Sequence, residues 1–179
     1  MAAYSALLSA LVVVVVVSSG AGAAETALDQ VCGGLGGDYI TPAACVSALC
    51  ADQAACRAAG DAHAVAALAA RLAAANATAA KQSIQAYARS PPPNSPAAAE
   101  AARACLQLYA GVVPALQWAE QSVAAGRYPG AREVMQAALY VPGGCDGMAG
   151  DEVKLPSENG AFSMMAEVVH AVLASMSRA

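Results

Sequence analysis

Two histidines, thirteen acidic residues and six cysteines are the residues of this 179-residue chain whose types suit chemistry. Neither histidine belongs to a metal-binding or catalytic spacing such as His-Glu-x-x-His, and no Gly-x-Ser-x-Gly or phosphate-loop motif occurs. We expect His63 to be a surface or capping residue in a first helical turn, and His170 to be solvated near the end of the last helix. The carboxylates are scattered, without a pair facing across a predicted cleft. The sequence therefore predicts a protein that is not an enzyme, with no cofactor and no metal site.

The first 24 residues have the character of a secretory signal peptide. The apolar run at residues 6–17 has about 12 residues, the length of a signal core, and is short of the ~18 needed to span a bilayer. Small residues follow, and we place cleavage just before Glu25. A signal anchor is the alternative, because no Lys or Arg precedes the run. We expect secretion to the extracellular space, with no membrane association after cleavage, and Asn76 in Asn76-Ala77-Thr78 is the one glycosylation sequon.

Six cysteines behind a signal peptide predict a disulfide framework. They allow fifteen pairings, and the residues alone do not choose among them. Cys50 and Cys56 need a bend in order to pair, since six residues of straight helix rise about 9 Å, beyond the roughly 4.4–6.8 Å between Cα atoms that a disulfide tolerates. We expect that bend at Asp52-Gln53. The six are Cys32, Cys45, Cys50, Cys56, Cys105 and Cys145.

The chain after the signal divides into a broken segment and a regular one. Glycines and a proline interrupt residues 25–60, which predicts short helices joined by turns. Asp61 and Ser157 are natural helix caps, and Pro142-Gly143-Gly144 should end the third helix just before Cys145. The long helices are predicted at residues 61–90, 97–125, 129–141 and 157–176.

Each long helix carries an apolar stripe at alternating steps of three and four residues. The expected core positions are Val65, Leu68, Leu72, Ala75 and Ala79; Cys105, Tyr109, Val112, Leu116, Ala119 and Val123; Ala131, Val134, Ala138 and Val141; and Phe162, Met165, Val169, Val172 and Met176. No segment alternates as a strand does. The fold class is therefore all-α, a disulfide-stapled up-down-up-down four-helix bundle (residues 61–178) with an N-terminal short-helix extension (25–60), together one domain.

Composition narrows the possible partners. The net charge is −4, with 9 basic against 13 acidic residues, which argues against nucleic acid and anionic membranes. A small lipid-binding module is one alternative, but plant lipid-transfer proteins have eight cysteines, some of them adjacent. A structural glycoprotein of the cell wall is another alternative, suggested by one Ser-Pro-Pro-Pro tract.

Several motifs, in a fixed order, carry a family resemblance. The strongest is Ala104-Cys105-Leu106-Gln107-Leu108-Tyr109, which is similar to a Cys-x-x-Leu-Tyr motif. The others are Val31-Cys32, Ala44-Cys45-Val46-Ser47-Ala48-Leu49, Ala67 to Thr78, Gly126-Arg127-Tyr128, Cys145-Asp146-Gly147, and Leu155-Pro156-Ser157-Glu158-Asn159 with Phe162. Over about residues 28–178 the chain resembles the plant invertase inhibitor and pectin methylesterase inhibitor family.

That resemblance implies disulfides Cys32–Cys45 and Cys105–Cys145, and it leaves Cys50 and Cys56 as an extra pair. The family's third bundle helix usually continues through its last cysteine, whereas a Pro-Gly-Gly sequence intervenes here. Family members bind a carbohydrate-active enzyme of the plant cell wall (apoplast) in a one-to-one, non-covalent complex that covers the substrate cleft. The resemblance therefore implies an enzyme inhibitor.

Two target enzymes are compatible with the resemblance. The Pro-Lys-Phe stretch associated with invertase inhibitors is absent, which favours pectin methylesterase as the partner. The spacing between Cys32 and Cys45 resembles an allergen-like subgroup often described as invertase inhibitors, which keeps acid invertase, cell-wall or vacuolar, as the alternative.

Overall fold

The computed structural model describes residues 25–35, 40–91 and 95–176, and the regular secondary structure of these segments is entirely helical. The predicted signal peptide, residues 1–24, lies outside them. None of the described helices has both the length and the apolar character that crossing a membrane requires. The helices are α1 (Ala27–Gly33), α2 (Pro42–Leu49), α3 (Gln53–Ala58), α4 (Ala62–Arg89), α5 (Pro96–Ala124), α6 (Tyr128–Ala138), α7 (Tyr140–Ala149) and α8 (Ser157–Met176).

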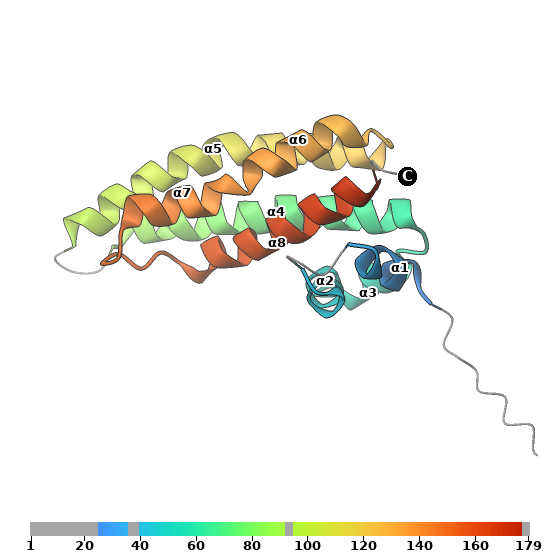
Figure 1. Ribbon diagram of the computed structural model, residues 1–179. Helices are drawn as coiled ribbons and strands as arrows, with labels where there is room; N and C mark the ends of the chain where they lie inside the picture. Colours follow the sequence, from blue (N-terminus) through green and yellow to red (C-terminus); the bar gives the residue numbers. More distant parts are fainter. Residues whose placement is uncertain (1–24, 36–39, 92–94, 177–179) are drawn as a thin grey trace, which may run out of the picture.

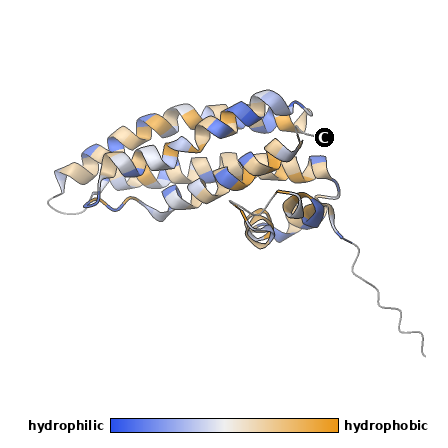
Figure 2. Ribbon diagram, viewed as in Figure 1, coloured by the Kyte–Doolittle hydropathy of each residue, from blue (hydrophilic) through white to orange (hydrophobic). Residues whose placement is uncertain are grey.

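The long helices form the predicted antiparallel four-helix bundle (Figure 1). Helix α4 packs against α5 and α8, and the consecutive helices α6 and α7 pack between α5 and α8 to complete the ring. Figure 2 shows apolar residues along the full length of the bundle rather than at one end. The predicted fold class is confirmed.

Side-chain caps set the starts of the two longest helices, whereas the predicted cap Ser157 is instead the first residue inside α8. Asp61 Oδ1 accepts a hydrogen bond from the Ala64 amide at 2.7 Å, and Ser95 Oγ caps α5 through the Ala98 amide at 3.3 Å. Each cap satisfies one amide of a first turn that has no partner within the helix. At the far end of α5, Gly126 takes the left-handed conformation (φ 73°), which glycine adopts without a steric penalty.

The prediction that Pro142-Gly143-Gly144 ends the third helix before Cys145 is wrong. Helix α6 ends at Ala138, but Leu139 keeps right-handed helical angles and α7 continues the column through Cys145. Pro142 lies in the first turn of α7, where its missing N–H breaks no intrahelical bond. The proline therefore marks the junction of two helices, and the cysteine lies on the second.

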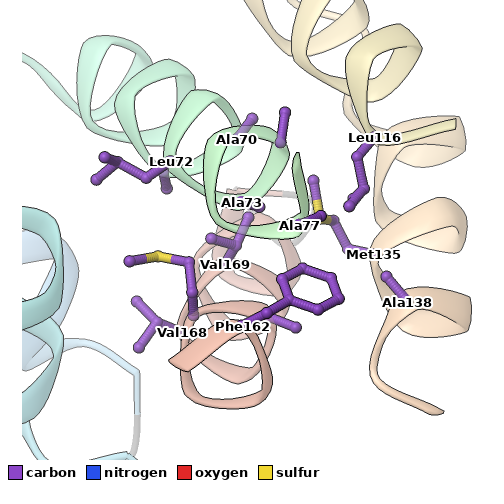
Figure 3. Packing of buried hydrophobic residues seen from close by; sticks show 14 of the residues in the cluster. Ala70, Leu72, Ala73, Ala77, Leu116, Met135, Ala138, Phe162, Val168 and Val169 are labelled. Atoms are coloured by element: carbon purple, nitrogen blue, oxygen red, sulfur yellow. The ribbon is translucent and has the colours of Figure 1, made fainter. Parts of the chain in front are cut away.

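Alanine forms much of the core, and it also misled part of the prediction. Ala75 and Ala79 are exposed, while α4 buries Ala73, Ala77 and Ala80 on the face toward its neighbours. In α6 the deeply buried side chain is Met135, whereas Val134 is half-buried. Figure 3 shows the packing, in which Ala77 of α4, Leu116 of α5, Met135 of α6 and Phe162 of α8 lie close together between their helices.

The N-terminal extension consists of three short helices that pack against the bundle, with α1 and α3 beside α4 and with α2 beside both α4 and α8 (Figure 1). Cys32 of α1 and Cys45 of α2 are joined, with their Cα atoms 5.7 Å apart. Cys50 and Cys56 are also joined, at 4.9 Å, and the chain turns between them where Asp52 caps α3. The extension is therefore closed by two disulfides of its own.

Candidate inhibitory surface

A third disulfide fixes two bundle helices to each other beneath an exposed face. Cys105 of α5 and Cys145 of α7 are both fully buried, and their Cα atoms lie 4.8 Å apart. The bond closes a loop with a sequence separation of 40 residues. Because α5 and α7 cannot slide past each other at this level, the surface above the bond is held in one shape.

A buried polar cluster locks the same helices to α8. The Tyr109 hydroxyl donates to Asn159 Oδ1 at 2.9 Å, and Asn159 Nδ2 donates to Asp146 Oδ1 at 2.9 Å and to the Pro142 carbonyl at 3.2 Å. Tyr109 is fully buried and packs its ring on Phe162, with centroids 5.8 Å apart. Burial, reinforced by the Asp146 carboxylate, raises the pKa of Tyr109 far above its usual value, so the hydroxyl keeps its proton and remains a donor.

Replacing Asn159 by leucine is expected to lower the free energy of unfolding by about 3 kcal/mol, because the buried Tyr109 hydroxyl and Pro142 carbonyl would lose their partner. Tyr109→Phe removes one hydroxyl and should cost only about 1 kcal/mol. Urea unfolding of the two variants beside the wild type measures both changes. A leucine variant as stable as the wild type would show that this cluster does not hold α8.

Large apolar side chains stay exposed along α5, where it packs against α6 and α7. Trp118 is 50% exposed and Leu108 is 37% exposed, although both belong to α5. A Cβ built on Gly130 of α6 would lie 3.0 Å from the Trp118 ring, and one built on Gly144 of α7 would lie 3.1 Å from Leu108. The α5 side chains therefore lie close over glycines of the neighbouring helices, and a larger residue at either position would have to displace them.

We call this surface the α5–α7 face. Tyr140 (72% exposed) and Met148 (41% exposed) lie one turn before and one turn after Gly144, on one side of α7. Leu108 and Met148 thus flank the α5–α7 contact, whereas Trp118 lies farther along α5 against α6 and Tyr140 also borders a cavity toward α8. The face is defined by Leu108, Gly111 and Trp118 of α5, Gly130 of α6, and Tyr140, Gly144 and Met148 of α7.

The α5–α7 face carries little charge. Between Arg103 and Glu120, each exposed position of α5 holds an uncharged residue. The one ionisable group of α7 besides Tyr140 is Asp146, whose carboxylate accepts from Asn159. A face of exposed aromatic and aliphatic groups with few charges has the composition of the centre of a protein–protein interface.

The structure places His63 on the surface and His170 partly inside the protein. His63 is exposed near the start of α4, as predicted, and its Nδ1 lies 2.6 Å from the Tyr128 hydroxyl. The expected solvated position of His170 is wrong: the residue is half-buried, and Nε2 is shielded from solvent. The apolar packing of α8 against α6, which a one-dimensional stripe does not locate, accounts for that difference. Within the described residues, no cluster of three or more His, Cys, Asp or Glu is placed to hold a metal ion.

The predicted glycosylation site lies inside a helix. Asn76 is half-buried in α4, and its Nδ2 donates to the Leu72 carbonyl at 2.9 Å. Thr78 of the same sequon bonds back to the Ala74 carbonyl at 2.8 Å. The acceptor nitrogen is thus engaged in the folded chain.

The model of the plant invertase/pectin methylesterase inhibitor family matches residues 26–174. The chain belongs to this family. The match covers the N-terminal extension and nearly all of bundle helices α4 to α8, which agrees with the fold described above. No curated protein and no solved structure matched the chain.

As a member of the invertase/pectin methylesterase inhibitor family, the chain is expected to act through its surface. Two features of the structure were not predicted from the sequence: the exposed Trp118 and the buried Asn159. Trp118 lies outside the apolar stripe of α5, which could have marked it as exposed. Asn159 stands in a motif of the family resemblance, but nothing in the sequence placed it beside Tyr109.

Proposed function

We propose that this protein is a secreted inhibitor of plant pectin methylesterase that binds non-covalently, one to one, and covers the substrate cleft. The family match over residues 26–174 supports an inhibitor of pectin methylesterase or invertase and carries the proposal. Pectin methylesterase is preferred because the chain has no Pro-Lys-Phe stretch. Acid invertase is the alternative, favoured by the spacing of Cys32 and Cys45.

The α5–α7 face is the surface that we assign to the enzyme. Aromatic residues are enriched and charges are depleted at the centres of protein–protein interfaces, and this face exposes Trp118, Tyr140 and aliphatic side chains. The Cys105–Cys145 disulfide and the Asn159 cluster hold the part of this face around Leu108 and Gly144 in one shape before binding. A pre-organised surface loses little conformational entropy on association, so more of the contact energy remains as affinity.

A parallel titration tests the proposed target. The secreted, oxidised protein is added to purified pectin methylesterase and to acid invertase, and the residual activity of each enzyme is followed. We expect loss of pectin methylesterase activity with an endpoint at one inhibitor per enzyme, and unchanged invertase activity. The reverse result would establish the alternative, and no effect on several members of either enzyme class would refute the inhibitor proposal.

Secretion and glycosylation complete the proposal. We place signal cleavage before Glu25, which leaves Thr26 to cap α1 near the new N-terminus. A glycan on Asn76 would have to be added before α4 forms, because its Nδ2 bonds to Leu72 in the folded chain. N-terminal sequencing of the secreted protein, and its mass before and after enzymatic deglycosylation, measure the two properties.

A further inference from the structure

The contact between α6 and α8 contains a histidine in an unusual environment. His170 of α8 is half-buried, and its Nε2 is shielded from solvent with no hydrogen-bond partner among the described residues. A cavity opens beside the ring, and we call the contact around this histidine the α6–α8 joint. The cavity is lined by Ile40, Gln136, Leu139, Tyr140, Glu167 and Ala171.

The charges around His170 come from two helices. Helix α6 contributes Arg132, which disfavours a cationic imidazole, and Glu133, which favours it. Helix α8 itself contributes Glu167 one turn earlier, while α7 brings the phenol of Tyr140 and the N-terminal extension brings the apolar Ile40. Burial is the largest influence and, with Arg132, it lowers the pKa of His170 below the ordinary 6.5.

We propose that the α6–α8 joint is acid-sensitive: protonation of His170 puts a second cation beside Arg132, with an N–H on the buried nitrogen that has no acceptor, and weakens the packing of α8 on α6. Glu133 favours the cation, but burial and Arg132 outweigh it. A charge in this partly dry contact is therefore costly, and the histidine relieves the cost by losing its proton or by leaving the joint. The inference does not depend on which enzyme the protein binds, nor on the inhibitor proposal.

The direction of the pH effect follows from linkage. Because the pKa is lower in the folded chain than in the unfolded chain, the unfolded state takes up the proton first as the pH falls. The stabilisation by neutral His170 is therefore fully present above about pH 6.5 and is lost below it. Asp29 and Glu158 also have lowered pKa values, but their ordinary values of 3.8 and 4.5 place their losses at more acidic pH.

Urea unfolding at about pH 7.5, 6.5 and 5.5 tests the joint in three proteins: wild type, His170→Gln, and His63→Gln as the matched control on an exposed histidine. We expect wild type and His63→Gln to lose stability in parallel toward pH 5.5, and His170→Gln to lose clearly less. A His170→Gln profile parallel to that of the wild type would overturn the proposal. An NMR titration of the folded wild type, with the pKa of His170 at or above 6.5, would overturn it even if the glutamine variant failed to fold.

Discussion

Trp118→Ala is expected to weaken inhibition of pectin methylesterase by about 30-fold or more, the effect of losing a central tryptophan worth about 2 kcal/mol or more in an interface. Trp118 is half exposed, so the same change should leave the free energy of unfolding within about 1 kcal/mol of the wild type. Inhibition constants and urea unfolding of the variant separate the two effects.

Met164→Ala is the matched control for Trp118. Met164 is 60% exposed on α8 and is not part of the α5–α7 face. Its truncation should change neither inhibition nor stability. If Trp118→Ala inhibited as well as the wild type, the enzyme would have to bind another face of the bundle.

Removal of the Cys105–Cys145 disulfide, by alanine at both positions, is expected to lower the free energy of unfolding by about 4 kcal/mol, from the chain entropy of a loop with separation 40. The Cys50–Cys56 bond spans only 6 residues, so its removal should cost about 2 kcal/mol. Urea unfolding of the two double variants compares them directly. A loss for the Cys105–Cys145 variant no greater than that for the Cys50–Cys56 variant would contradict the argument from loop length.

The helix limits could be predicted because single residues determine them. Asp61 caps the amide of Ala64, and the long helices α4 and α5 begin and end within a residue or two of the expected positions. The stripe of α5 was also right, because Tyr109, Val112 and Leu116 recur at helical spacing and all three are buried. Local chemistry was sufficient for these features.

Alanine limited the prediction of which α4 face is buried. Ala75 and Ala79 were expected in the core, but alanine occurs on all sides of α4, so its position carries little information about burial. At Pro142, by contrast, the local sequence was informative but misleading. A proline near glycines suggests a stop, and only tertiary packing of Cys145 against α5 shows that the helix resumes.

The candidate surface could be identified only from the tertiary structure. Sequence spacing places Leu108 and Trp118 on α5, but the approach of these side chains to Gly144 and Gly130 joins segments far apart in the chain. The same holds for Asn159, which lies 50 residues from Tyr109 in the sequence and accepts its hydrogen bond. Contacts between residues so distant in the sequence depend on how the helices pack.

Competition with substrate tests most directly whether the protein inhibits by covering the cleft. Initial rates of pectin methylesterase are measured over a range of pectin concentrations at several fixed inhibitor concentrations. Coverage of the cleft predicts that the apparent KM for pectin rises with inhibitor concentration while kcat stays unchanged. A fall in kcat at constant KM would contradict it, because the enzyme would then bind pectin and this bundle at the same time.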